Sequence, residues 1–171
     1  FLLTHLLLEN LEKAAPARVL FVTSEAHRFG GLSVNDLNWD RRPFIGMLAY
    51  GAAKIAQIHT TTQLAEKYQD TRVTFNLMHP GEVRTNIGMN NNFFYRVYKK
   101  YLLNLFLKEP TISAESLYYL AAEPSLENVT GKFFNLTTEE KPAWYAVKPK
   151  VRQLVWDRSF AIIEPYLKEE R

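Results

Sequence analysis

Two apolar runs that flank a long alanine-rich segment constrain the fold of this chain more than any other feature. Residues 18–23 read Arg-Val-Leu-Phe-Val-Thr, and residues 72–78 read Arg-Val-Thr-Phe-Asn-Leu-Met. The first run, rich in β-branched and aromatic side chains, has the length expected of a buried strand of a parallel sheet. The second is a further strand candidate and ends at residues 79–81, His-Pro-Gly. Residues 46–68 lie between the two runs, contain no proline and repeat apolar side chains at helical spacing. The order strand, helix, strand predicts a parallel sheet with crossover helices.

The rest of the chain extends this order. We expect helices over residues 1–12, 113–122 and 149–166, a loop over 25–45, and a last strand over 131–136. The predicted fold class is therefore α/β, with three strands and flanking helices. Three strands are few for a sheet that is covered on both faces, and no strand precedes the first helix. We therefore expect further strands upstream of Phe1.

Charge and composition argue against several classes of function. The net charge is +3 with scattered basic residues, whereas nucleic-acid binding favours a clustered basic surface. The chain has no cysteine, which excludes disulfides and thiolate metal sites, and no histidine has a second ligand at metal-binding spacing. No uncharged apolar run is long enough to span a bilayer, and we find no secretory signal. We expect an intracellular protein without metal or nucleic acid, either cytoplasmic or peripherally associated with an organelle membrane.

Polar residues gather where the predicted strands end. Ser24 follows the first strand, residues 79–81 (His-Pro-Gly) follow the second, and Tyr50 lies near the start of the helix between them. Ligands of open α/β sheets bind at the carboxyl ends of the strands. Ser24 and Tyr50 are therefore predicted to form a proton-transfer site at this edge.

Tyr50 and Lys54 are four residues apart and so lie on one face of the predicted helix. A free phenol has a pKa of about 10, too high for ready proton exchange near neutrality, and a nearby ammonium stabilises the phenolate. The spacer of one glycine and two alanines lets a ligand or a neighbouring backbone approach closely. Taken alone, such a pair is also common on surfaces without any role.

Three segments, in this order, resemble the catalytic core of the short-chain dehydrogenase/reductase family. Residues 19–27 resemble the strand with the family's catalytic serine, residues 49–54 its catalytic helix, and residues 73–85 the next strand with its P-G-x-V-x-T turn. By this resemblance the fold is the C-terminal half of a Rossmann-type doubly wound parallel sheet, and residues 1–171 are a partial domain. The family's glycine-rich phosphate turn is absent from the chain. We therefore expect the N-terminal nucleotide-binding half to be missing and the chain alone to have little activity.

The resemblance also implies the roles of the site residues. Tyr50 exchanges a proton with the substrate oxygen, and Ser24 hydrogen-bonds that oxygen. Lys54 lowers the pKa of Tyr50 and holds the hydroxyls of the nicotinamide ribose. The hydride comes from the cofactor, NADP or NAD, with NADP slightly favoured. The backbone of Val83 is expected at the nicotinamide carboxamide and Thr85 at a cofactor phosphate. The full set of cofactor-binding residues is Tyr50, Lys54, Pro80, Gly81, Val83 and Thr85.

Within the family, residues 36–38, 108–111 and 131–134 resemble the branch of retinol dehydrogenases and WW-domain oxidoreductases. This branch implies a small lipophilic alcohol or carbonyl substrate that is retinoid-, steroid- or lipid-like. Residues 85–112 are then expected to form a lid over the substrate, since residues 93–107 are rich in aromatic side chains with interleaved cations. The same composition suits contact with a membrane surface, or an ordinary core helix.

Two alternative functions stand beside this one. A serine hydrolase would pair Ser24 with His27 or His79, but the chain lacks the G-x-S-x-G motif of such enzymes. The other alternative is a truncated, inactive chain that serves only as an interaction or structural fragment. The resemblance further implies a homodimer formed through the helix that carries Tyr50.

Overall fold

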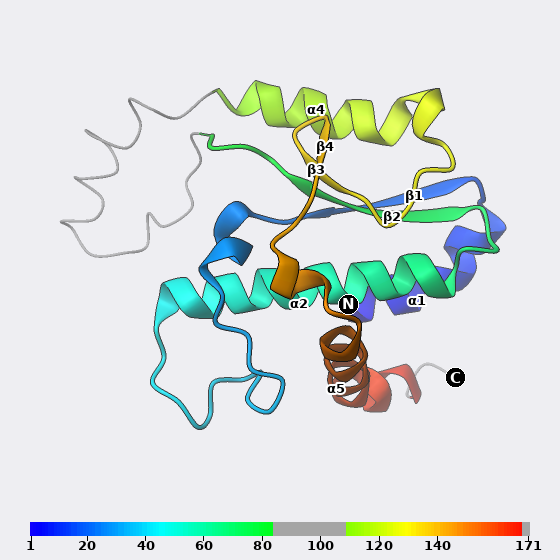
Figure 1. Cartoon of the computed structure of the whole chain (residues 1–171). Coiled ribbons are helices and arrows are strands. Elements are labelled where there is room, and N and C mark those ends of the chain that lie inside the picture. Colours follow the sequence, from blue (N-terminus) through cyan, green and yellow to red (C-terminus); the bar gives the residue numbers. More distant parts are fainter. Residues whose placement is uncertain (84–108, 169–171) are drawn as a thin grey trace.

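A four-stranded sheet forms the centre of the protein. The computed structural model describes residues 1–83 and 109–168. The strands lie side by side in the order β1 (Ala17–Val22), β2 (Val73–His79), β3 (Phe133–Asn135) and β4 (Thr138–Glu140) (Figure 1). The first three are parallel, and β4 pairs with β3 antiparallel. The predicted α/β class is confirmed, but the sheet has four strands where three were predicted. The prediction missed β4 because this strand is three residues long and carries no apolar pattern.

Helices cover both faces of the sheet. On one face lie α1 (Leu2–Lys13), α2 (Gly46–Lys67) and α5 (Pro149–Lys168), and on the other lies α4 (Pro110–Ala122) (Figure 1). Short 3-10 helices complete the described chain: η1 (Glu25–Phe29), η3 (Pro124–Leu126) and η4 (Trp144–Val147). The four helices agree with the predicted ranges to within a few residues at each end. Within the described residues, no helix is both long and apolar enough to cross a membrane.

β2 is the inner strand that joins the two layers of the core. All of its residues are buried, and its alternate side chains point to opposite faces of the sheet. Leu77 packs with Ile58 of α2, whereas Met78 packs with Leu120 of α4. Because both faces are covered, the polar residues of β2 are buried as well, and the Asn76 side chain is accommodated by hydrogen bonds to the backbone of Val129 and Lys132.

A histidine is buried on α2, close to α5. His59 has no exposed surface, and the backbone of Tyr145 lies near enough to its ring to oppose in part the effect of burial on the histidine pKa. Arg152 of α5, whose Nη1 lies 2.7 Å from Oε1 of Glu66, adds a positive charge near the ring. Burial foremost, and then the Arg152 charge, lower the pKa of His59 from 6.5 to about 4. The folded protein therefore holds this histidine neutral.

The free energy of unfolding is expected to fall in mild acid because of His59. The unfolded chain takes up this proton near pH 6.5, whereas the folded chain takes it up only near pH 4. The stabilisation is therefore complete above 6.5 and is lost as the pH falls to 4, by at most about 3 kcal/mol. Urea unfolding of the full-length protein across this range measures the loss. His59→Leu should show a smaller decrease in acid, and an equal decrease in both proteins would contradict the assignment.

Candidate active site

The register of the sheet brings the predicted site residues to one edge. The N–H of Thr23 donates to the carbonyl of Met78 at 2.8 Å, so β1 and β2 end side by side. Ser24 follows the first of these strands and Pro80 follows the second. The start of α2, with Tyr50, lies at the same edge, because η1 follows Ser24 directly and packs on this part of α2. The predicted convergence of the strand ends and the helix start is thus present in the fold.

Ser24 begins the helix η1. Its backbone is extended, with φ −157° and ψ 151°, and its Oγ accepts a hydrogen bond from the N–H of Ala26 at 3.2 Å. The side chain therefore caps η1, which holds Oγ in one position. A hydroxyl that accepts one bond still has its hydrogen to give. Ser24 is thus able to donate to a substrate oxygen.

A glycine next to Tyr50 sets the distance between η1 and α2. A Cβ atom at Gly51 would lie 2.7 Å from the carbonyl oxygen of Ala26 and 2.9 Å from that of Gly30. Both distances are shorter than a carbon–oxygen contact allows, and both neighbours are backbone atoms. The close backbone approach predicted for the spacer between Tyr50 and Lys54 is therefore confirmed, and its partner is η1.

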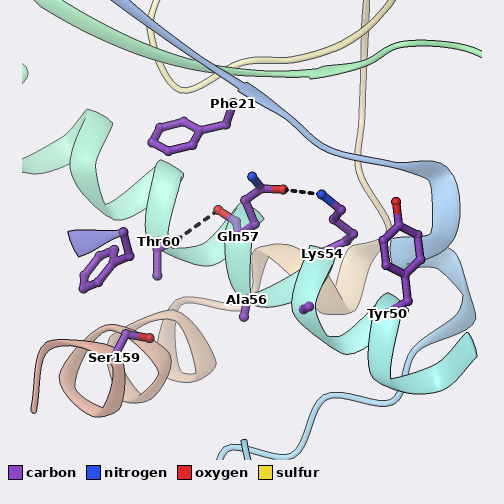
Figure 2. A pocket seen from close by; sticks show the side chains of 9 residues that line it. Phe21, Tyr50, Lys54, Ala56, Gln57, Thr60 and Ser159 are labelled. Atoms are coloured by element: carbon purple, nitrogen blue, oxygen red, sulfur yellow. Dashed lines mark hydrogen bonds between the residues drawn. The ribbon is translucent and has the colours of Figure 1, made fainter. Parts of the chain in front are cut away.

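The Lys54 ammonium lies beside the Tyr50 ring. Its Nζ is 5.6 Å from the ring centroid and donates to the carbonyl of Val22 at 3.2 Å and to Oε1 of Gln57 at 3.3 Å. Figure 2 shows the lysine side chain extending between Tyr50 and Gln57. Burial lowers the pKa of Lys54 from its ordinary value. Tyr50 is 44% exposed, so a ligand at this edge can reach it.

Sequence reasoning does not identify Gln57. This residue lies three positions after Lys54 in the same helix, a spacing that places the two side chains on one face. That spacing was the available signal. By accepting from the ammonium, Gln57 helps to fix the direction in which Lys54 extends.

A cavity of about 440 Å³ opens beside the pair. Tyr50, Lys54 and Gln57 line it together with Phe21 of β1 and Ser159 of α5 (Figure 2). The cavity thus offers one charged group and one phenol on an otherwise largely apolar surface. A ligand that enters from this side meets the two side chains that the sequence singles out.

The histidines near Ser24 do not form the pair that a serine hydrolase needs. Nδ1 of His27 lies 2.8 Å from the backbone carbonyl oxygen of Ser24, and Nε2 accepts from the N–H of Ala143 at 3.1 Å. Both ring nitrogens of His27 are therefore occupied, and neither bonds the Ser24 hydroxyl. His79 is buried, which lowers its pKa, and its Nδ1 has no hydrogen-bond partner among the described residues.

The turn after β2 is held from two sides. The Ser113 hydroxyl of α4 donates to the carbonyl of Pro80, and the N–H of Leu136 donates to the carbonyl of His79 at 2.9 Å. Gly81 has φ 76°, a left-handed conformation that favours glycine, and a Cβ there would lie 3.3 Å from Cδ2 of Leu136. The turn is therefore a fixed backbone feature at the edge of the site.

Among the described residues, the Lys54 ammonium has the hydrogen-bonding capacity that a nicotinamide nucleotide requires. The Lys54 ammonium has three N–H donors and two hydrogen bonds within the described chain, so one donor is left for a hydroxyl such as that of a ribose. Val83 is half-buried and follows the Gly81 turn. Thr85, like most of the predicted lid over 85–112, lies outside the described residues.

Comparison with known proteins gives one consistent family. Residues 1–94 match the family described as short chain dehydrogenase. Retinol dehydrogenase 13 from Mus musculus is 34% identical in an alignment of length 167 that covers 95% of this chain and 50% of that protein. Retinol dehydrogenase 14 from Homo sapiens is 36% identical, over 95% of this chain and 49% of its own length. This chain thus spans about half the length of the curated relatives that it matches.

The fold agrees with solved structures as well. The crystal structure of a short chain dehydrogenase from Shigella flexneri superimposes with a TM-score of 0.54 at 25% identity. The match covers 82% of this chain and 47% of that protein. The similarity therefore extends over most of this chain and over about half of the solved one.

Proposed function

The chain belongs to the short-chain dehydrogenase family, and we propose that it carries the proton-transfer groups of an NAD(P)-dependent oxidoreductase. The reaction interconverts an alcohol and a carbonyl on a small lipophilic substrate. One observation carries the proposal: the Lys54 ammonium lies 5.6 Å from the centroid of a tyrosine ring, at the edge where β1 and β2 end. An ammonium and a phenol in this arrangement suit proton transfer to an oxygen.

Tyr50, Lys54 and Ser24 have different roles in the proposed reaction. Tyr50 gives its hydroxyl proton to the substrate oxygen during reduction and takes it back during oxidation. The positive charge of Lys54 stabilises the phenolate that remains, and its free N–H holds a hydroxyl of the cofactor ribose. Ser24 donates its hydroxyl hydrogen to the same substrate oxygen, which fixes the position of that oxygen. When bound, the nicotinamide supplies or accepts the hydride.

The relatives support the proposed substrate class. Two of the matched proteins are named retinol dehydrogenases, which supports a retinoid or a similar apolar alcohol for this chain. The largely apolar surroundings of Lys54 in the cavity agree with such a substrate. NADP is the cofactor that we favour over NAD, with Pro80, Gly81 and Val83 near its nicotinamide.

Self-association through α2 and contact with a membrane surface are further parts of this proposal. The residues before and at the start of α2 support the first, because Phe44, Ile45 and Met47 are exposed apolar side chains there. A partner copy that covered them would lie close to Tyr50. Membrane contact rests on the composition of residues 93–107, which lie outside the described residues.

Cofactor binding tests the proposal directly. Titration of the full-length protein with NADPH, followed by the change in nicotinamide fluorescence, should show saturable binding. Lys54→Met should weaken it about 10- to 100-fold, because a hydrogen bond from a charged group is worth about 1.5–3 kcal/mol. Lys13→Met is the control, since Lys13 pairs with Glu9 on the surface of α1. No binding of NADPH or NADH by the unmodified protein would contradict the proposal.

A further inference from the structure

The backbone carbonyl of Ser24 accepts two hydrogen bonds from one residue. The N–H of His27 lies 3.2 Å from it, and Nδ1 of the His27 ring lies 2.8 Å from it. The His27 ring is fully buried and packs edge-on against Phe133 of β3, with the ring centroids 5.2 Å apart. The peptide that follows Ser24 therefore has little freedom to rotate.

The partners of His27 determine its protonation. The carbonyl of Ser24 can only accept, so Nδ1 must carry a hydrogen, and the N–H of Ala143 can only donate, so Nε2 must be bare. Burial lowers the pKa of His27, which favours the same neutral ring. A single tautomer thus links the segment at Ala143 to the Ser24 turn.

A tyrosine strengthens this link from the same segment. The Tyr145 hydroxyl lies 2.6 Å from the carbonyl oxygen of Arg28 and 3.2 Å from that of His27. Residues 143–145 therefore contact η1 through both His27 and Tyr145. The segment that precedes α5 and the turn that carries Ser24 form one hydrogen-bonded unit, although they are more than a hundred residues apart in the sequence.

We propose that His27 is a positioning residue that holds Ser24 in place for the substrate oxygen. The inference rests on the proposed function, because it assigns to Ser24 the role of hydrogen-bond donor. His27 acts on the reaction only through the Ser24 peptide, and it does not touch the reacting atoms. Loss of its bond to Ser24 lets Oγ move, and a shift of about 1 Å in such a group is able to cost about 100-fold in rate.

Two variants separate the two ends of the His27 ring. In His27→Asn the side-chain amide is placed like Nδ1 and keeps a donor for the Ser24 carbonyl, but does not reach Ala143. In His27→Gln the side-chain oxygen is placed like Nε2 and keeps an acceptor for Ala143, but loses the Ser24 bond. We expect kcat of the full-length protein to fall at least about tenfold in His27→Gln and much less in His27→Asn. The KM for NADPH should be unchanged in both.

The double variant with Ser24→Ala shows whether His27 works through Ser24. If it does, His27→Gln should cause no further loss of kcat once the Ser24 hydroxyl is gone. If the losses of kcat caused by His27→Gln and Ser24→Ala add in the double variant, the inference is overturned. It is also overturned if kcat in His27→Gln and His27→Asn falls in proportion to the loss of thermal stability. Neither result would remove the proposed oxidoreductase activity. An unmodified protein without oxidoreductase activity would instead overturn the proposed function.

A measurement on the unmodified protein tests the geometry without relying on activity. Long-range ¹H–¹⁵N spectra of the histidine rings distinguish the two neutral tautomers. His27 should carry its hydrogen on Nδ1, as the Ser24 and Ala143 bonds require. A hydrogen on Nε2 would remove the bond to Ser24 and overturn the inference, even if the variants did not fold.

Discussion

Tyr50→Phe is expected to lower kcat by about 100- to 10,000-fold without unfolding the protein. The range is that of a general acid or base, which is the role proposed for the Tyr50 hydroxyl. Tyr50 is 44% exposed, and within the described residues its hydroxyl makes no hydrogen bond, so stability should change little. Steady-state oxidation of retinol, or reduction of retinal, by the full-length protein measures the loss. Thermal unfolding measured on the same samples shows that the variant is folded.

A matched tyrosine serves as the control for this substitution. Tyr118 on α4 is 76% exposed and lies on the other face of the sheet, so Tyr118→Phe should leave kcat unchanged. A Ser24-dependent hydrolase would keep its activity in Tyr50→Phe, and so would an enzyme that uses another acid. Retention of kcat in a folded Tyr50→Phe protein would therefore remove Tyr50 from the mechanism.

The parts of the fold that local patterns control were predictable. β2 reads as a strand because β-branched and aromatic side chains run up to a His-Pro-Gly stop, and α2 reads as a helix because apolar side chains recur along it without proline. The short, charged strand β4 was not predictable. Its residues Thr138–Glu140 carry no apolar pattern, and they are held by pairing with β3. Such a strand depends on its neighbour and not on its own sequence.

In the site, too, local spacing was predictable from the sequence and long-range contacts were not. The distance between Lys54 and Tyr50 follows from helical spacing within one element, so the sequence was sufficient to place the pair. The role of His27 depends on Ala143, which is 116 residues away in the chain, and no local pattern reports that contact. The burial of His59 likewise depends on how α5 packs on α2. Long-range packing decides these features, and only the structure shows it.

Gly51→Ala is expected to move η1, and with it Ser24, away from α2 and Tyr50. The added methyl group would lie 2.7 Å and 2.9 Å from two carbonyl oxygens of the η1 region, which are backbone atoms that cannot rotate away. Overpacking of this kind costs about 1–3 kcal/mol, and its relief requires η1 to move away from α2. Because η1 follows Ser24 directly, that movement takes Ser24 away from Tyr50. We expect kcat to fall about 100-fold, as for a group misplaced by about 1 Å, together with a lower unfolding midpoint in urea.

Gly46→Ala in the same helix isolates the effect of crowding. Among the residues that the structure describes, a Cβ at Gly46 would have one neighbour within 4 Å, the Phe44 side chain at 3.9 Å, which is an ordinary contact. Alanine favours helix over glycine by up to about 1 kcal/mol, so Gly46→Ala should be neutral or stabilising and should keep kcat. The two variants make the same chemical change five residues apart, and only one of them meets a backbone. Equal kcat values in the two proteins would show that the contact between η1 and α2 does not control the position of Ser24.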